Sequence, residues 1–401
     1  MMQPARPVNT AVVILVLGML TALAPLSIDM YLPAFPDIAR DLHTHVSDVA
    51  LSLSFYFVGV SVGQLAYGPL LERFGRKKPL IAGVIIYILA AAACAFATSV
   101  SSLIAARLFQ AIGGCVGMVA SRAIIRDLFP TEENARVLSM LMLVTSVSPL
   151  IAPTAGGMIT GYWGWRATFI VMIGMAVAVL AGVYWLLPES HQPNRQVSLN
   201  PKSVLMSFLN ILKNRQFLFF TLAGSLCSVG LFGYITSATT IFLDQFHIAQ
   251  QQLGWIVGSL SMAIVAASQV NNLLLKKFEV DCLAVWAAGA QSVIGIVFVG
   301  VALLGLSSLA VTIVFIFALL ACLGFIFPNT TSLAMEPMGK NAGNASALMG
   351  AIQMLIGAGA SAFFSMLPDK SVTTVACIMA GCAVLSFAIF ASGRRILQLQ
   401  D

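Results

Sequence analysis

Long apolar stretches alternate with short polar connections along almost the whole chain. A continuous apolar stretch of about 20 residues can cross a bilayer as a helix, whereas a transmembrane barrel would show short segments of alternating polarity. Charged residues or clusters of Gly, Pro and Asn bound the stretches, which cover residues 10–33, 49–70, 79–98, 102–123, 137–160, 167–187, 217–243, 252–274, 282–304, 308–333, 344–367 and 372–392. The pattern predicts an all-α membrane protein with twelve transmembrane helices.

The twelve stretches fall into two sets of six. The longest polar stretch lies between the sets, so we predict an N-terminal six-helix bundle over residues 1–187, a cytoplasmic linker over 188–215 and a C-terminal bundle over 216–401. A Leu-Leu pair followed by a basic helix end occurs at residues 70–74 and again at 274–278. Two repeated halves with a substrate site between them is how many secondary transporters are built.

Composition excludes a soluble protein. The chain is 59% apolar and carries 21 Lys and Arg and 15 Asp and Glu among 401 residues, whereas a soluble chain of this length would carry roughly 100 charges. The net charge of +6 is scattered over the connections, so a nucleic-acid partner is not expected. The seven cysteines lie in or beside apolar stretches, which favours neither a disulfide framework nor a metal site.

The basic residues also predict the orientation. Placing the N-terminus inside puts 17 of the 21 Lys and Arg on the cytoplasmic side and leaves Arg40, Arg166 and Lys370 outside, with Arg107 within a span. Basic residues favour the cytoplasmic side of membrane proteins, so both termini are expected there. Pro25 interrupts the first stretch, which continues to Pro33, so this stretch is expected to remain as a membrane helix instead of being a cleaved signal peptide.

A polar motif follows the second stretch. Gly68 and Gly75 flank an acid, Glu72, and the bases Arg73 and Arg76 in the sequence GPLLERFGRKK. Glycine permits close helix contact and a tight turn, and the charges can pair across a helix end. The motif resembles the signature G-x-x-x-D-R-x-G-R-[KR]-[KR] of the major facilitator superfamily, with Glu in place of the usual Asp. The resemblance implies two pseudo-symmetric six-helix bundles and a role for these five residues in conformational gating.

Other segments extend this resemblance over nearly the whole chain. Arg107 begins RLFQAIGG, which is similar to the superfamily's buried-arginine motif, and SPLIAPTAGG at 148–157 is similar to the Pro/Gly motif of its exporters, with Ala152 where a glycine is common. The segment PLSIDMYLPA at 25–34 resembles the bicyclomycin-resistance (Bcr/CflA) branch of drug:proton antiporters. The resemblance implies a secondary exporter of drugs, driven by proton entry.

The fifth stretch has a second interpretation. Its prolines remove backbone hydrogen bonds and its glycines allow close packing, so either a gating helix or a plain packing helix fits Pro149, Pro153, Gly156 and Gly157.

Asp29 and Arg107 are the candidate proton-coupling residues. Ionisable groups inside a membrane helix are costly and usually functional. Asp29 is the one acid well within a predicted span, and the predicted helix directions place Arg107 at a similar depth. A low-dielectric environment favours the protonated form of an acid, whereas a nearby guanidinium favours its ionised form, so an acid under both influences can take up and release a proton. The alternative is a static ion pair that holds the two helices together. Asp244 and Glu336 near helix ends are expected to be solvated or capping groups.

The predicted substrate site mixes aromatic, thioether and amide side chains, which suit promiscuous binding of amphipathic molecules. Its candidates are Tyr56, Gln110, Met142, Phe232, Tyr234, Asn329 and Gln353.

The leading hypothesis is a proton-driven exporter of drugs or other amphipathic molecules. Export or symport of a small metabolite such as an amino acid stays open. A membrane enzyme is a more remote alternative, because the four histidines lack metal-ligand spacing. The absence of a nucleotide-binding loop from the sequence disfavours a primary pump. We therefore expect no catalytic residue, metal or cofactor. We expect a monomer in the bacterial inner membrane, surrounded by lipid and partnered only by protons and its small-molecule substrate.

Overall fold

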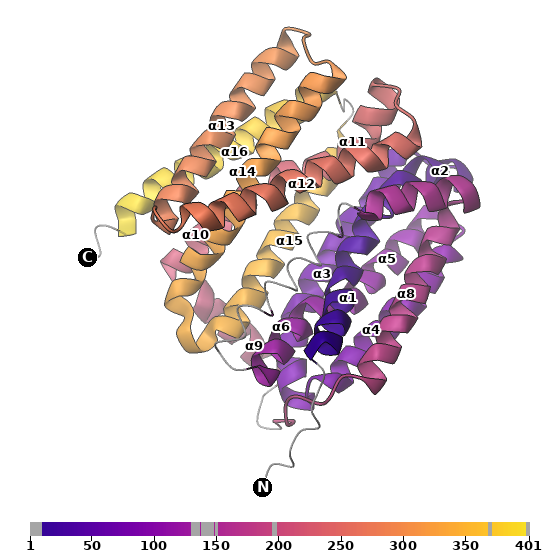
Figure 1. The fold of residues 1–401 in the computed structure, drawn as a ribbon, viewed down its shortest axis with the longest axis vertical. Helices are drawn as coiled ribbons and strands as arrows, with labels where there is room; N and C mark the ends of the chain where they lie inside the picture. Colours follow the sequence, from indigo (N-terminus) through magenta and orange to yellow (C-terminus); the bar gives the residue numbers. More distant parts are fainter. Residues whose placement is uncertain are drawn as a thin grey trace.

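The computed structural model describes residues 10–129, 137, 148, 151–194, 199–367 and 371–397. Within these residues it is all helical, as predicted. Figure 1 shows the N-terminal half, in indigo to magenta, beside the C-terminal half, in orange to yellow. Met142 and Pro149 lie outside the described residues.

The N-terminal half is built from helices that follow the predicted apolar stretches, with several longer than expected. They are α1 (Thr10–Asp29), η1 (Leu32–Ala34), α2 (Phe35–Asp41), α3 (Val46–Phe74), α4 (Lys77–Ala95), α5 (Val100–Gly114), α6 (Val116–Leu128), an unlabelled helical segment over residues 151–163, and α8 (Trp165–Trp185).

The C-terminal half begins with a short helix that was part of the predicted linker. Its elements are α9 (Pro201–Leu212), α10 (Arg215–Cys227), α11 (Val229–Thr239), η2 (Thr240–Gln245, a π-helix), α12 (Gln250–Leu274), α13 (Val280–Leu303), α14 (Leu309–Met335), η3 (Glu336–Asn341), α15 (Ala342–Met366) and α16 (Val372–Leu397).

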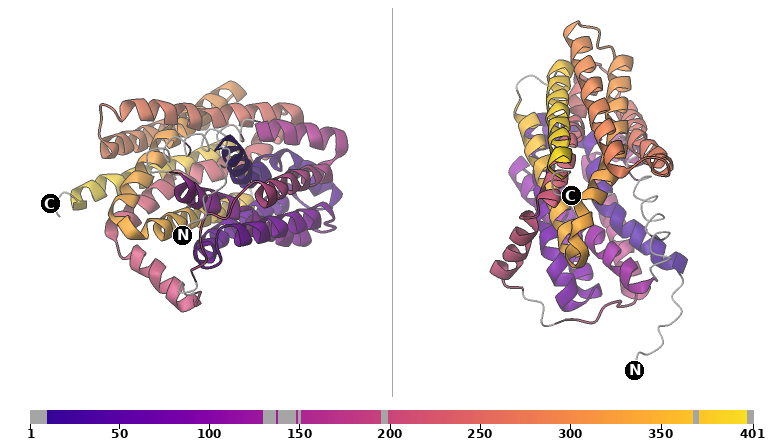
Figure 2. Two further views of the ribbon diagram at one scale, coloured as in Figure 1. Left: turned by 60° about the horizontal axis from the view of Figure 1, so that its bottom comes forward. Right: turned by 90° about the vertical axis from the view of Figure 1, so that its left-hand side faces the viewer.

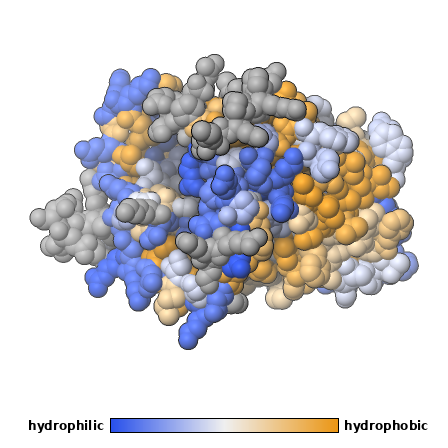
Figure 3. All heavy atoms as spheres, turned by 90° about the horizontal axis from the view of Figure 1, so that it is seen from below, coloured by the Kyte–Doolittle hydropathy of each residue, from blue (hydrophilic) through white to orange (hydrophobic). Residues whose placement is uncertain are grey.

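Eleven helical segments in the described part of the chain are long and apolar enough to cross a membrane. The twelfth predicted stretch, residues 137–160, is described as continuous helix only from residue 151. Large apolar side chains are exposed on many of these helices, and Figure 3 shows a broad hydrophobic surface beside a hydrophilic area. Exposed apolar surface of this extent fits a protein that is embedded in lipid.

Local sequence determines where the helices begin and turn. Ser99 caps α5 by accepting a hydrogen bond from the Ser102 backbone N–H, and Asn214 caps α10 in the same way through Phe217. Gly75 (φ 84°) and Gly164 (φ 79°) adopt backbone angles that favour glycine, and each joins two consecutive helices. The chain therefore reverses direction with very short connections.

Two hydrophobic clusters form the interior. One consists mainly of side chains from α1–α8 and the other mainly of side chains from α9–α16, although some residues of the second half, such as Phe232 and Ala358, belong to the first cluster. Helix α15 packs along α3, where Ser54 donates a hydrogen bond to Ser361 at 2.9 Å and Ser61 donates to the Ala351 carbonyl at 2.9 Å. The seam between the halves is thus closely packed along this pair.

Two ends of the molecule serve as reference points. The α2 end carries α2, η1 and η2, and the linker end carries the α3–α4 turn and residues 187–194. Figure 2 shows α9 at the margin of the main helix bundle. Phe208 and Ile211 of α9 are buried in the second hydrophobic cluster.

Candidate functional site

Arg107 on α5 is completely buried. Its Nη1 donates to Gln110 Oε1 at 2.7 Å and its Nη2 donates to the Ser27 carbonyl of α1 at 3.0 Å. The rings of Tyr31 and Tyr56 lie 4.4 and 4.2 Å from its Cζ. Among the described residues, Arg107 has no carboxylate partner. Its charge is stabilised instead by a carbonyl, an amide and two aromatic faces.

A second layer of hydroxyl groups holds these partners in place. Ser27 Oγ lies 2.6 Å from the Tyr87 hydroxyl, and Tyr31 OH lies 2.7 Å from Ser52 Oγ. Tyr56 OH donates to the Ala24 carbonyl of α1 at 3.2 Å. Four helices, α1, α3, α4 and α5, therefore contribute to one buried polar network around Arg107.

Asp29 is the last residue of α1, two residues beyond the carbonyl that Arg107 binds. It is 8% exposed, and in the described part of the chain its carboxylate has no hydrogen bond or ion pair. The alternative interpretation, a static ion pair with Arg107, is not what the structure forms. Helix α11 of the second half contacts η1, which begins three residues after Asp29, so the end of α1 that carries this carboxylate is at the seam between the two halves.

The structure separates the predicted substrate-binding residues into groups. Tyr56 and Gln110 are engaged with Arg107. Phe232 packs edge-on against Phe57 of α3, with ring centroids 4.8 Å apart, while Asn329 exchanges two hydrogen bonds with Asn271, at 2.9 and 3.3 Å. Gln353 of α15 is half-buried. These residues contact different partners, and their role in substrate binding stays a prediction.

The predicted gating motif forms a charge cluster at the linker end. Arg76 is 2% exposed and donates to Asp127 of α6 at 2.7 Å and to Glu72 at 3.1 Å. Burial by itself lowers the pKa of Arg76, but the hydrogen bonds and charges of Asp127 and Glu72 outweigh it and raise the pKa above its ordinary value. Arg126 also lies 3.8 Å from Glu72. The cluster therefore joins α3, α4 and α6 through a guanidinium that stays charged.

Other members of the motif occupy the surrounding positions. The Arg73 guanidinium carbon lies 6.0 Å from the Phe74 ring, and a Cβ added to Gly68 would be 4.0 Å from Asn344 Oδ1 of α15. Gly68 is thus the member of the motif that faces the second half.

Residues 187–194 bind to this motif, which was not expected from the sequence. Glu189 accepts hydrogen bonds from the backbone N–H groups of Arg76, at 2.7 Å, and Lys77, at 3.2 Å, and so caps the N-terminus of α4. Lys77 Nζ donates to the carbonyls of Tyr184 and Leu187 at the end of α8. His191 Nε2 lies 3.2 Å from Glu72 Oε2. Glu189 and His191 lie in a predicted polar linker, where an acid and a histidine form no sequence pattern that would predict this contact.

The Pro/Gly segment meets the first half and the second half at the α2 end. A Cβ added to Gly156 would overlap with the Met30 carbonyl oxygen, next to Asp29. On the other bundle, a Cβ added to Gly254 of α12 would lie 2.7 Å from Thr154 Cα. Pro153 and Gly157 are buried. The segment therefore lies between the end of α1 and α12, a place that fits a gating helix and a packing helix equally well.

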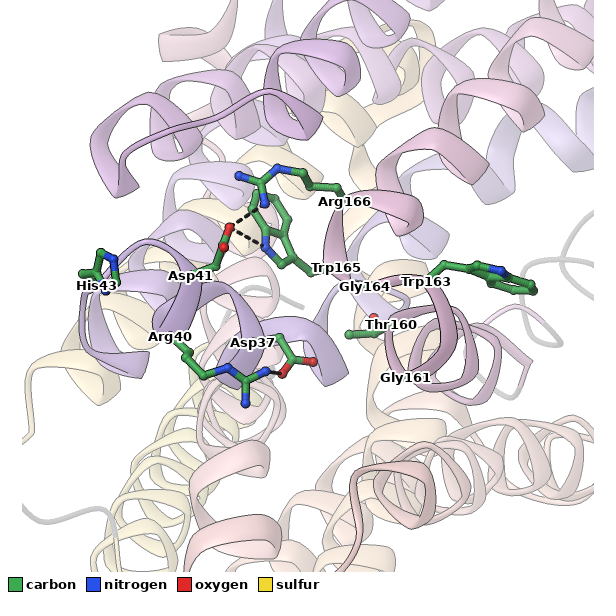
Figure 4. Close-up of a pocket in the computed structure, with 10 residues that line it drawn as sticks. All are labelled: Asp37, Arg40, Asp41, His43, Thr160, Gly161, Trp163, Gly164, Trp165 and Arg166. Carbon is green, nitrogen blue, oxygen red and sulfur yellow. Dashed lines mark hydrogen bonds and ion pairs between the residues drawn. The ribbon is translucent and has the colours of Figure 1, made fainter.

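A pocket of about 780 Å³ opens at the α2 end (Figure 4). Its acids are paired with arginines: Asp37 with Arg40, and Asp41 with Arg166. Trp165 Nε1 also donates to Asp41 at 3.1 Å. The Asp37–Arg40 pair lies within α2, whereas Asp41 connects α2 to the start of α8, so the polar groups of the pocket stabilise this end of the first half.

Comparison with known proteins identifies relatives that cover the chain. It is 30% identical over 384 residues to the uncharacterized MFS-type transporter YdgK of Bacillus subtilis, covering 93% of both chains. It is 29% identical over 386 residues to a bicyclomycin resistance protein homolog of Haemophilus influenzae, covering 94% of this chain and 95% of that one. Multidrug resistance protein D of Escherichia coli is 29% identical over 396 residues, with 94% of each covered.

Fold and family comparisons agree. A crystal structure of a D-xylose-proton symporter superposes with a TM-score of 0.73 at 14% identity, over 95% of this chain and 97% of that one, which establishes the fold. The family model described as Major Facilitator Superfamily matches residues 17–363. The chain is thus a multi-pass membrane transporter and not an enzyme. It belongs to the Major Facilitator Superfamily.

Proposed function

We propose that this transporter exports drug-like amphipathic molecules in exchange for protons. The observation that carries the proposal is Asp29: a carboxylate at the seam between the halves, unpaired among the described residues, and next to a backbone segment that the buried Arg107 holds. An acid in such a place can bind a proton when the seam opens to one side and release it when the seam opens to the other. The drug-resistance names of two relatives support this direction of transport.

In this mechanism Arg107 is a positioning residue. It fixes the Ser27 carbonyl, two residues before Asp29, while its own charge is stabilised by the faces of Tyr31 and Tyr56. Rocking of the two bundles would alternately expose Asp29, with the Glu72–Arg76 cluster and the Pro153–Gly157 segment as gates. The excess of basic residues at the linker end supports cytoplasmic termini. We propose a monomer in the bacterial inner membrane, powered by the proton gradient without a cofactor.

The decisive experiment measures the release of protons when a drug is added. In proteoliposomes containing a pH-sensitive dye, adding an exported drug should cause proton release from the wild type, while Asp29→Asn should bind drug without releasing protons. Asp29→Glu should retain part of the coupling because the carboxylate is kept. Asp244→Asn is the matched control, because Asp244 is an exposed acid at the end of η2. Normal proton release from Asp29→Asn would remove Asp29 from the mechanism.

The substrate class needs a separate test. Expression in a drug-hypersensitive bacterium should raise resistance to several amphipathic compounds, and a protonophore should abolish that resistance. Resistance that persists without a proton gradient would exclude antiport. Absence of resistance to any compound, together with altered amino-acid efflux, would favour a metabolite exporter instead.

A further inference from the structure

Helix α11 carries buried hydroxyl groups that lack partners. Tyr234 is 2% exposed and Ser237 is fully buried. In the part of the chain that the structure describes, neither the Tyr234 hydroxyl nor Ser237 Oγ has a hydrogen-bond partner. Buried hydroxyl groups without partners are costly, and water is the usual partner that satisfies them.

These two hydroxyls share one face of α11 because they are three residues apart. Helix α11 contacts η1, which begins three residues after Asp29 in the chain. By contrast, Thr236 is satisfied, since it donates to the Phe232 carbonyl and to Ser361, both at 2.8 Å. The face with Tyr234 and Ser237 thus extends from the Asp29 region toward the α2 end.

At the same end, the seam between the halves is closely packed where α12 meets the first half. Helix α12 contacts η1, and Gly254 lies against Thr154 so closely that even a methyl group would collide with the backbone. Beyond Ser237, α11 continues into the π-helix η2, a type of helix that often occurs at functional sites. A path here could carry protons while excluding a drug.

We infer that Tyr234 and Ser237 hold a chain of water molecules through which protons reach Asp29 from the α2 end. The inference rests on the proposed antiport. Each hydroxyl accepts a hydrogen bond on one side and donates on the other, so each takes one proton and passes one on, and the last proton binds the Asp29 carboxylate. Protons then enter by a path separate from that of the drug. The Asp29 carboxylate can be protonated without the α2 end of the seam opening wide enough for a drug molecule to pass.

The test is the pH dependence of transport in proteoliposomes. When the relay is broken, proton supply should limit turnover where protons are scarce. Tyr234→Phe and Ser237→Ala should therefore each lose about tenfold or more in drug-coupled proton flux at an α2-side pH of about 8, a loss typical of a missing proton-transfer group. The loss should largely disappear at about pH 6, and Ser237→Ala, which changes no predicted drug contact, should leave drug affinity unchanged. Ser237→Thr should restore the flux because it keeps a hydroxyl.

Thr239→Val is the matched control. Thr239 is also a buried hydroxyl without a partner among the described residues, but it lies on a different face of the same helix, so its removal should not change the pH profile. Equal losses at both pH values, or a parallel loss of drug affinity, would identify Tyr234 as a packing or drug-contact residue and overturn the inference. Unchanged flux at the higher pH would overturn it as well. Failure of the wild type to couple drug to protons would instead defeat the proposed function.

Discussion

Arg107 illustrates how a charge can be kept inside a membrane protein without an opposite charge. Hydrogen bonds from a charged group contribute about 1.5–3 kcal/mol each, and a cation over an aromatic face about 0.5–2 kcal/mol. Two hydrogen bonds and two tyrosine rings surround the guanidinium. A planar, forked cation is required, because one side chain must reach Gln110 and Ser27 while its faces contact the rings.

We therefore predict that Arg107→Lys folds but transports poorly. Lysine keeps the charge but cannot hold the amide and the carbonyl at once while lying between two rings. Drug efflux should fall about tenfold or more, which corresponds to roughly 1.4 kcal/mol or more. Efflux assays at matched membrane expression would measure this, and wild-type efflux from Arg107→Lys would show that only the charge matters.

The tyrosine ring and the tyrosine hydroxyl should have separable effects at position 31. Tyr31→Phe keeps the aromatic face and loses the hydrogen bond with Ser52. This change should lower the free energy of unfolding by about 1 kcal/mol and should reduce efflux only slightly. Tyr31→Leu also removes the aromatic face over Arg107 and should lower both the stability and the efflux more strongly. Thermal unfolding in detergent and efflux of the two variants provide the comparison. Equal effects of the two substitutions would exclude a contribution from the ring.

At the residue scale, the sequence identifies the charged residues within the spans but does not predict which side chains surround them. Asp29 and Arg107 were conspicuous because charges are scarce in the spans. Tyr31, Tyr87 and Ser27 were missed, because a tyrosine or serine in an apolar helix has the same pattern whether it packs or supports a charge.

At the scale of elements, the end of α1 depends on a close backbone contact. Any side chain at Gly156 would overlap with the Met30 carbonyl. We predict that Gly156→Val displaces α1 and destabilises the protein by about 1–3 kcal/mol, as overpacking does, with loss of proton coupling at Asp29. Gly174→Ala on α8, where no atom lies within 4 Å, is the control and should be neutral. Thermal stability and proton release would be measured together, and a stable, coupled Gly156→Val would contradict the packing argument.

The charge cluster at the linker end should behave as a unit. Asp127→Asn leaves Arg76 buried with only Glu72 opposite and should cost about 3–5 kcal/mol, whereas the double variant Arg76→Met, Asp127→Leu should lose less than the sum of the single variants. Unfolding measurements on the wild type, the single variants and the double variant give the coupling energy. Strictly additive losses would mean that the pair at 2.7 Å contributes no interaction of its own.

Most helices could be predicted from the apolar stretches, but their interruptions could not. The break at Cys115 between α5 and α6, and that at Ser228 between α10 and α11, lie inside predicted continuous spans. In lipid, a helix is apolar on all sides, so its periodicity carries little information about bends. The π-helix η2 and the extension of the first span through α2 were missed for the same reason.

At the scale of the whole molecule, the predicted membrane fold is confirmed, while the exact domain boundaries stay predictions. Polarity predicts a cytoplasmic linker over 188–215, but it does not predict its contacts: the first part is hydrogen-bonded to the α3–α4 turn, and α9 is packed on the second half. Hydrogen bonds made by a backbone cap leave no pattern in a polar sequence. Glu189 and His191 therefore could not be recognised as members of the gating cluster.

The linker makes a prediction of its own. Glu189→Gln weakens the cap on α4, which should cost about 1 kcal/mol, and should loosen residues 187–194 from the gating motif. Protease cleavage in the polar segment should then become faster while efflux changes little. Glu279→Gln, an exposed acid before α13, is the control. Unchanged cleavage would mean that the contacts of Lys77, His191 and Asn194 retain the segment without the Glu189 cap.

Anchoring both parts of the linker also limits what the transporter can carry. The Asn194 backbone N–H donates to the Glu72 carbonyl in the first half, and α9 is fixed on the second half through Phe208 and Ile211. The chain between Asn194 and Leu199, just before α9, can extend to roughly 18 Å at most. Unless one anchor detaches, the covalent length of this connection limits how far the two bundles can separate at the linker end. It therefore also limits the width of the molecule that can pass between them.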